Sequence, residues 1–263
     1  MIAPFRQLLG QRPRPAVPPG ERVYAIGDIH GRADLFEALI AAIDRDDAAS
    51  GPAQTTVILL GDLIDRGADS AGVLAAARAW QQRRTVRILA GNHEEMFLQC
   101  FTDAELMRHF LRFGGRETVL SYRVDPDAFT AADVAEAQAL MREAVPEEEL
   151  DFIRGFEDSI AIGDYLFVHA GIRPGVAIAE QETRDLRWIR GAFTDSRVDH
   201  GLLVVHGHTI FEEPDIRPNR IGIDTGAYYS GKLTALRLEG EARALLETSE
   251  NDGRIDVQMR SIP

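Results

Sequence analysis

Residues that commonly bind metal ions recur at the ends of short apolar runs in this chain. The runs are rich in β-branched residues, and several carry a glycine beside the polar residue, which is typical of buried strands. The polar residues are Asp28 and His30, Asp62, Asn92 and His93, His169, and His206 and His208. In open sheets, ligands bind where the carboxyl ends of strands give way to loops. We therefore expect these side chains to meet at one edge.

The donors fit a site for two ions. Asp28 and His30 are two residues apart and could reach one ion. Asp62 follows the next strand, and its two oxygens could bridge to a second ion about 3.5–4 Å away. That ion could take one amide oxygen and two imidazoles from Asn92, His169 and His208. The open positions left for water indicate a catalytic site, because structural sites are closed.

Each segment alone is weak evidence, because turns and helix N-caps use the same residue types. Their recurrence at five strand ends is what favours metal binding. His206 lies two residues before His208, and we interpret it as a supporting residue, not a ligand. Asp224 could orient His208. Glu94 fits the first turn of a helix, where a carboxylate caps and complements the dipole.

Composition limits the class of protein. The chain has 263 residues, 45% hydrophobic and 27% charged, which is ordinary for a globular protein. A net charge of −13 argues against a nucleic-acid partner, because phosphate backbones are bound by clustered Lys and Arg. Cys100 is the single cysteine, so no intrachain disulfide can form. With no long apolar segment and no signal-like amino terminus, we expect a cytoplasmic protein without a membrane partner.

Strand and helix patterns alternate before a helix-rich stretch, and strands dominate afterwards. Strands are predicted at 56–60, 85–89, 160–162, 165–169, 202–205, 220–223, 232–238, 242–247 and 255–259, with one ending at Gly27 and helices over 35–43 and 70–83. Strands alternating with helices indicate βαβ units. Residues 1–21 are expected to form an arm and a proline-rich lead-in, and residues 22–263 one domain. Within it, residues 94–157 are predicted to be a helical insertion that caps the edge of the sheet.

Three blocks together resemble the signatures of calcineurin-like metallophosphoesterases: Gly27-Asp-Ile-His-Gly31, Gly61-Asp-Leu-Ile-Asp-Arg-Gly67 and Gly91-Asn-His-Glu94. More narrowly, they resemble the bacterial phosphoprotein phosphatase branch, which includes the serine/threonine phosphatases, lambda phage phosphatase and diadenosine tetraphosphatases. Residues 168–171, 207–209 and 223–226 fit the bacterial members, and the likeness extends over roughly residues 22–240. Other subgroups have a second histidine where this chain has Ile210, which favours the phosphatase branch over nucleases.

The resemblance implies an α/β fold, a four-layer α/β/β/α sandwich of two sheets flanked by helices, with a helical insertion. It implies two divalent metal ions, with manganese expected and iron, zinc, nickel or magnesium as alternatives. The implied ligands are Asp28 and His30 for the first ion, Asp62 as the bridge, and Asn92, His169 and His208 for the second.

The resemblance also implies catalytic residues. His93 would protonate the leaving alkoxide, and Asp65 would pair with it. Arg66 would contact phosphate oxygens. Arg190 is our preferred second phosphate-binding arginine, with Arg173 and Arg187 as alternatives.

The implied activity is hydrolysis of phosphoserine and phosphothreonine in proteins by a metal-activated water, so the expected partner is a phosphoprotein or a small phosphorylated substrate. One alternative is a dinucleoside polyphosphate hydrolase acting on diadenosine tetraphosphate. A catalytically silent metal-binding scaffold is a third hypothesis, which the retained His93, Asp65 and Arg66 oppose.

Overall fold

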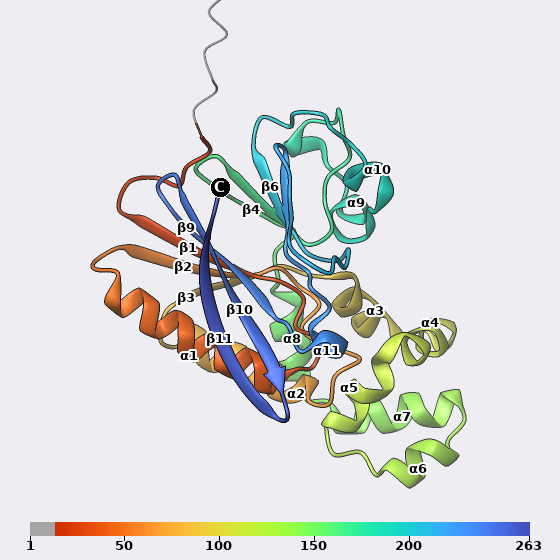
Figure 1. The fold of residues 1–263 in the computed structure, drawn as a ribbon. Coiled ribbons are helices and arrows are strands. Elements are labelled where there is room, and N and C mark those ends of the chain that lie inside the picture. Colours follow the sequence, from red (N-terminus) through yellow and green to blue (C-terminus); the bar gives the residue numbers. More distant parts are fainter. Residues whose placement is uncertain (1–13) are drawn as a thin grey trace, which may run out of the picture.

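The computed structural model describes residues 14–263 (Figure 1). The expected arm over residues 1–10 and the start of the lead-in lie outside the described residues. Two mixed sheets form the centre of the molecule, with helices on their outer faces, so the predicted α/β sandwich class is confirmed. None of the helices in the described range is long and apolar enough to cross a membrane.

The first sheet has six strands in the order β11-β10-β9-β1-β2-β3. They are β1 (Glu21–Ile26), β2 (Gln54–Leu59), β3 (Thr85–Ile88), β9 (Thr234–Glu239), β10 (Ala242–Asn251) and β11 (Arg254–Ile262). β1, β2 and β3 are parallel, and helices α1 (Ala33–Ala49) and α2 (Ser70–Gln81) connect them, which confirms the predicted βαβ units. β9 to β11 continue the sheet as antiparallel strands.

The second sheet has five strands in the order β4-β5-β6-β8-β7. They are β4 (Ser159–Ile162), β5 (Tyr165–Val168), β6 (Leu203–His206), β7 (Asp215–Ile216) and β8 (Arg220–Gly222). β4 and β5, which match the strands predicted at 160–162 and 165–169, form a hairpin, and β5, β6 and β8 are parallel. The carboxyl ends of β5 and β6 therefore deliver loops on the same side.

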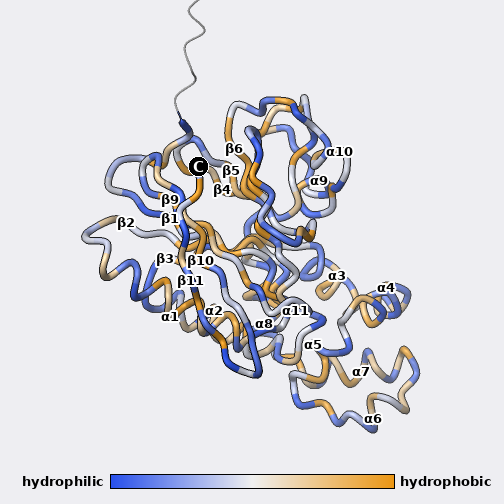
Figure 2. Tube along the Cα trace, in the orientation of Figure 1, coloured by the Kyte–Doolittle hydropathy of each residue, from blue (hydrophilic) through white to orange (hydrophobic). Residues whose placement is uncertain are grey.

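Three apolar layers explain the order of helices and sheets. On β1, Val23 and Ala25 face the second sheet, whereas Tyr24 and Ile26 face α1 and α2. This alternation is the period of two that a strand imposes on its side chains. A third apolar cluster covers the other face of the second sheet, where Val204 packs with Leu186 and Phe193. Figure 2 shows hydrophobic residues concentrated on the strands between the helices.

A helical segment, defined here as α3 to α8 (residues 92–154), interrupts the two sheets as predicted. It consists of α3 (Asn92–Cys100), α4 (Ala104–Phe110), a π-helical turn (Leu111–Gly115), α5 (Arg116–Ser121), α6 (Pro126–Ala131), α7 (Val134–Ala144) and α8 (Glu147–Arg154). α4 to α7 project to one side of the sandwich (Figure 1). The short elements η2 (Ile178–Glu180), α9 (Thr183–Trp188), α10 (Gly191–Thr194), α11 (Ala227–Ser230) and β7 were not predicted.

The described part of the proline-rich lead-in joins the two sheets. Val17 is buried, and its N–H donates to the carbonyl of Gly240 at 3.1 Å, next to the first sheet. The carbonyl of Ala16 accepts from the N–H of Asp164, in the hairpin of the second sheet, at 3.0 Å. The lead-in is thus extended, as expected, and it bridges both layers.

Candidate metal centre

The predicted ligands meet where loops leave the carboxyl ends of β1, β2, β5 and β6 and where α3 begins. All six are buried, and none is more than 5% exposed: Asp28, His30, Asp62, Asn92, His169 and His208. Burial of so many ionisable and polar donors is costly unless each has a partner. Their surroundings therefore show what the site can hold.

The loops that carry these residues have an unusual backbone. Seven non-glycine residues in the described range have positive φ, and five of them are predicted site residues: His30, Asp62, Asp65, Arg66 and His208. Such conformations are uncommon outside glycine, cost on the order of 1–3 kcal/mol each, and persist where the surrounding structure over-determines them. The strain is therefore concentrated at the site.

Glu94 holds the Asp62 loop in place. Its carboxylate accepts hydrogen bonds from the backbone N–H groups of Asp62 (2.9 Å), Leu63 (2.7 Å) and Gly91 (2.8 Å). Burial, with the nearby charge of Asp62, raises the pKa of Glu94 to about 7. The bond from Gly91 is the expected helix cap, and the bonds from Asp62 and Leu63 fix the neighbouring loop.

Gly91 allows the close approach of these two loops. A Cβ at this position would lie 2.1 Å from Asp62 Oδ1 and 2.5 Å from Asp62 N. Asp62 Oδ1 also accepts the backbone N–H of His93 at 3.0 Å. One carboxylate oxygen of Asp62 is thereby fixed by backbone, and the other, Oδ2, faces the histidines.

Three donors converge on His169. Its Nε2 lies 3.1 Å from Asn92 Oδ1, 3.2 Å from His208 Nδ1 and 3.5 Å from Asp62 Oδ2. Atoms bound at about 2.1 Å to one tetrahedral ion lie about 3.4 Å apart. Asp62, His169 and His208 therefore form a group with the spacing of a metal site.

The protonation states also fit a cation. His169 Nδ1 lies 2.8 Å from the carbonyl of Leu60, which can only accept, so Nδ1 carries the proton and the Nε2 lone pair faces Asn92 Oδ1 and Asp62 Oδ2. Lone pairs that face one another repel unless a cation lies between them. Burial, with the neighbouring His169, lowers the pKa of His208 to about 2, and burial lowers the pKa of His169 as well. Neutral imidazole is the ligand form.

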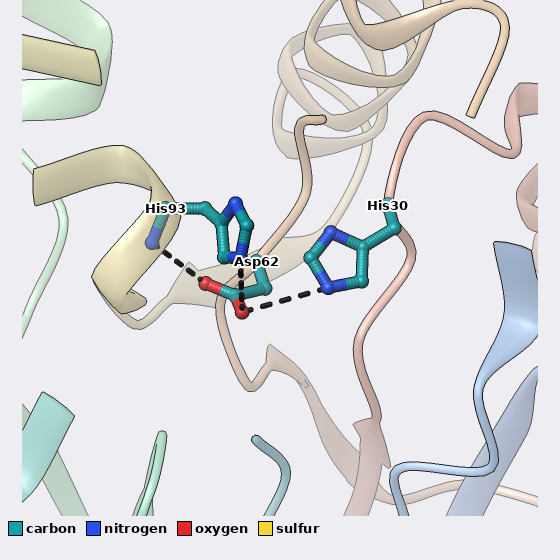
Figure 3. A group of neighbouring side chains, drawn as sticks. All are labelled: His30, Asp62 and His93. Atoms are coloured by element: carbon teal, nitrogen blue, oxygen red, sulfur yellow. Dashed lines mark hydrogen bonds and ion pairs between the residues drawn. The ribbon is translucent and has the colours of Figure 1, made fainter. Parts of the chain in front are cut away.

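A second group surrounds the same oxygen (Figure 3). Asp62 Oδ2 lies 3.6 Å from His30 Nε2 and 3.9 Å from His93 Nε2. The carbonyl of Ile64 accepts from His30 Nδ1 at 2.7 Å, so the His30 Nε2 lone pair also faces inward. The guanidinium of Arg66 lies between the rings, with Nη1 2.8 Å from His30 Nε2 and Nη2 2.9 Å from His93 Nε2. A cation at this group would have to displace the Arg66 fork.

Asp28 adds a buried negative charge beside these groups. Its carboxylate accepts the backbone N–H of His208 at 3.0 Å and lies near the carboxylate of Asp224. Burial and the charges of Asp224 and Asp62 raise the pKa of Asp28 well above its ordinary value, and burial raises the pKa of Asp224 to about 6. Asp28 and Asp224 thus resist ionisation beside the charged Asp62, and bound cations would relieve that repulsion. The donor set therefore fits two divalent ions.

Asp65 and His93 form a buried pair. His93 Nδ1 lies 2.6 Å from Asp65 Oδ2, so the carboxylate fixes the ring. Burial alone would lower the pKa of His93, but the carboxylates of Asp62 and Asp65 outweigh it and raise the pKa. The ring is thereby suited to holding a proton at Nε2 whenever Arg66 turns away.

The three arginine candidates differ in their partners. Arg173 pairs with Asp185 at 2.6 Å, and Arg187 pairs with Asp158 at 2.6 Å. The guanidinium of Arg190 is exposed and has no hydrogen bond or ion pair within residues 14–263. Burial lowers the pKa of His208, and the charge of Arg190 adds to that effect, which indicates that Arg190 lies near the donors.

His206 lies outside both donor groups, as interpreted from sequence. It is fully buried, its Nδ1 lies 3.0 Å from the carbonyl of Gly207, and its ring packs edge-on against Phe193 at 5.1 Å. His208, two residues later, has a backbone φ of +62° and belongs to the donor group around His169.

Sequence reasoning did not find three residues that contact the site. Thr118 hydrogen-bonds to Asp65, the Arg66 guanidinium lies 4.9 Å from the centroid of the Tyr228 ring, and Gly114 accepts the backbone N–H of Arg66 at 3.0 Å. The Gly114-Gly115 pair within a helix-forming stretch is the one visible signal in the sequence for this contact. Thr118 and Tyr228 carried no local signal.

Comparison with known proteins agrees with this geometry. Residues 21–239 match the calcineurin-like phosphoesterase family, and the chain belongs to it. The protein is therefore a metallophosphoesterase hydrolase, a class whose members generally bind a dinuclear centre of divalent metal ions. The alternative of a silent scaffold loses its support.

Two similar curated proteins carry different activities in their names. The chain is 26% identical to the asymmetrical bis(5'-nucleosyl)-tetraphosphatase PrpE of Anoxybacillus flavithermus over 81% of this chain and 88% of that protein. It is 29% identical to serine/threonine-protein phosphatase 1 of Salmonella typhimurium, over 82% and 92%. The crystal structure of a cold-active protein-tyrosine phosphatase from a psychrophilic Shewanella shares the fold, with a TM-score of 0.54 and 19% identity over 92% and 83% of the two chains.

Matched substitutions of two neighbouring histidines test the donor groups. We expect His208→Gln to lower the divalent metal bound per chain by about one ion, because one of the donors around His169 is removed. His206→Gln should leave the metal content unchanged. Elemental analysis after gel filtration, with melting curves to establish folding, measures both. Equal metal loss in the two variants would contradict the assignment.

A glycine substitution tests the support of Arg66. Gly114 has a φ of +107°, and a Cβ there would lie 2.6 Å from Arg66 Cγ and 2.7 Å from Arg66 N. Gly114→Ala should displace Arg66 and lower kcat/KM for a phosphate ester about tenfold or more, since a hydrogen bond to a charged group contributes about 1.5–3 kcal/mol. Gly155→Ala, where φ is −79° and the nearest atom is 3.3 Å away, is the control and should remain active. Similar activity in both variants would refute this role for Gly114.

Proposed function

We propose that this metallophosphoesterase is a phosphomonoesterase that removes phosphate from phosphoserine and phosphothreonine in proteins, with two manganese ions as cofactors. Asp28 and His30 would hold the first ion, Asp62 both, and Asn92, His169 and His208 the second. The carboxylate and amide oxygens suit manganese, whereas the imidazoles also suit iron, zinc and nickel, which are the alternatives. When bound, such ions lower the pKa of water and withdraw electron density from phosphate oxygens.

The observation that carries the proposal is the buried pair of His93 and Asp65. An alkoxide leaving from serine or threonine is strongly basic and needs a proton as the bond to phosphorus breaks, whereas a nucleoside phosphate leaving from an anhydride does not. His93, held through Nδ1 by Asp65 at 2.6 Å and with a raised pKa, would donate from Nε2. The presence of this acid supports an ester substrate.

Two arginines would bind the phosphate group. Arg66 presents a planar fork between His30 and His93, and the phosphate would draw it away from the rings. Its departure from His93 Nε2 leaves that nitrogen free to carry a proton, so phosphate binding and acid function are linked. Arg190, exposed and unpaired within the described residues, would approach from the other side.

Hydrolysis of a dinucleoside polyphosphate is the second candidate, because aromatic rings lie near the same arginine. Tyr228 packs on Arg66, its neighbour Tyr229 is 62% exposed, and Phe113, beside Gly114, is 44% exposed. Exposed aromatic rings can stack nucleobases. The tetraphosphatase named among the similar proteins is consistent with this candidate.

A comparison of kcat/KM for the two substrates tests the proposal. We expect kcat/KM for a phosphoserine or phosphothreonine peptide to exceed that for diadenosine tetraphosphate by about tenfold or more, or about 1.4 kcal/mol in transition-state stabilisation. Phosphate release from the peptide and nucleotide products from the tetraphosphate are measured with the manganese-loaded protein. A higher kcat/KM for the tetraphosphate would replace the first candidate with the second.

A further inference from the structure

The helical segment contacts the acid pair directly, through Thr118 on α5. Thr118 and Asp65 are separated by 53 residues in sequence, and both are fully buried. The Thr118 hydroxyl lies 2.5 Å from Asp65 Oδ1, and the backbone N–H of Asp65 donates to Thr118 Oγ1 at 2.9 Å. One side chain therefore contacts both the carboxylate and the backbone of Asp65.

The direction of each hydrogen bond follows from the atoms present. The Asp65 N–H can only donate, and it reaches Thr118 Oγ1 at 2.9 Å and Ser70 Oγ at 3.0 Å. The ionised carboxylate can only accept, so the Thr118 proton lies toward Asp65 Oδ1. Ser70 then donates its own proton to Thr118 Oγ1 at 2.9 Å. All hydroxyl and amide protons in this cluster have acceptors.

This network determines the orientation of the carboxylate. With Oδ1 fixed by Thr118, Oδ2 points to His93 Nδ1 at 2.6 Å. Removing the hydroxyl would leave Oδ1 buried without a donor, and the carboxylate would be free to turn away from His93. The effect would reach His93 Nε2, which lies on the far side of the ring.

We propose that Thr118 is a positioning residue for proton donation, acting through Asp65 on His93. This inference rests on the proposed function, in which His93 protonates the leaving oxygen. It also gives the helical segment, which was expected from sequence to cap the edge of the sheet, a role at the acid pair. Gly114, four residues earlier, accepts the backbone N–H of Arg66 at 3.0 Å, so the same segment supports both halves of the Asp65-Arg66 loop.

The dependence of rate on the leaving group separates positioning from general structural support. Phenyl phosphate releases a phenolate whose conjugate acid has a pKa of about 10, so its loss benefits from a proton. 2,4-Dinitrophenyl phosphate releases a much weaker base that leaves without one. Binding of the phosphate and attack by water are shared by both esters. A defect confined to proton donation therefore slows hydrolysis of phenyl phosphate only.

The experiment compares Thr118→Val with Thr118→Ser in the manganese-loaded full chain. General acid catalysis contributes about 10²–10⁴-fold, and we expect Thr118→Val to lose about 10- to 100-fold in kcat on phenyl phosphate. On 2,4-dinitrophenyl phosphate its kcat should stay within about threefold of the native value, a small part of that contribution. Thr118→Ser, which keeps the hydroxyl, should resemble the native protein on both. Melting curves and metal content establish that the variants are folded and loaded.

His93→Asn distinguishes failure of this inference from failure of the proposed function. If His93→Asn shows the selective loss and Thr118→Val does not, the role of Thr118 is wrong and the acid assignment stands. If His93→Asn loses equally on both esters, the acid assignment itself is wrong. Equal losses for Thr118→Val on both esters would indicate structural support only and overturn the inference. Should Thr118→Val not fold, Thr118→Cys, with a weaker donor of similar size, should show a smaller loss on phenyl phosphate alone.

Discussion

One carboxylate oxygen, Asp62 Oδ2, faces ring nitrogens of His30, His93 and His169 at 3.5–3.9 Å, and much of the surrounding structure serves to keep it there. Its sister oxygen is held by the backbone N–H of His93, and the loop carrying Asp62 is held by Glu94. The lone pairs of His169 Nε2, Asn92 Oδ1 and Asp62 Oδ2 face one another, and such lone pairs repel unless a cation lies between them. The fold therefore confines a strained arrangement that ions bound on either side of Asp62 would stabilise.

The two-sheet architecture makes this confinement possible. Donors come from strands of both sheets, and the apolar layer between the sheets fixes the strands relative to one another. The helical segment extends from the same edge and returns to the site at Thr118 and Gly114. Apart from Asn92 at the start of α3, the metal-binding residues lie on loops of the sandwich, whereas the loop with Asp65 and Arg66 is supported by Gly114 and Thr118. This division predicts that changes around Gly114 and Thr118 affect the acid and the arginine more than metal affinity.

Much of this could be predicted from the sequence because the donors directly follow buried strands. The βαβ order, the hairpin before His169 and the helical character of residues 94–157 also followed from periodicity and glycine positions. Periodicity reports which residues are buried, yet it does not report which distant loop a helix side chain contacts, so Thr118 was missed. Glu94 was interpreted as a local cap because its bonds to Asp62 and Leu63 cross 32 and 31 residues. The two-residue strand β7 is too short to show alternation.

The central claim is that two divalent ions share Asp62 at this site. Anomalous diffraction from crystals of the manganese-loaded protein tests it most directly, since each ion gives its own peak. We predict two peaks about 3.5–4 Å apart, one on each side of the Asp62 carboxylate, with His30 beside one and His169 and His208 beside the other. A single peak, or two peaks of which neither lies at Asp62, in crystals of active protein would contradict the account.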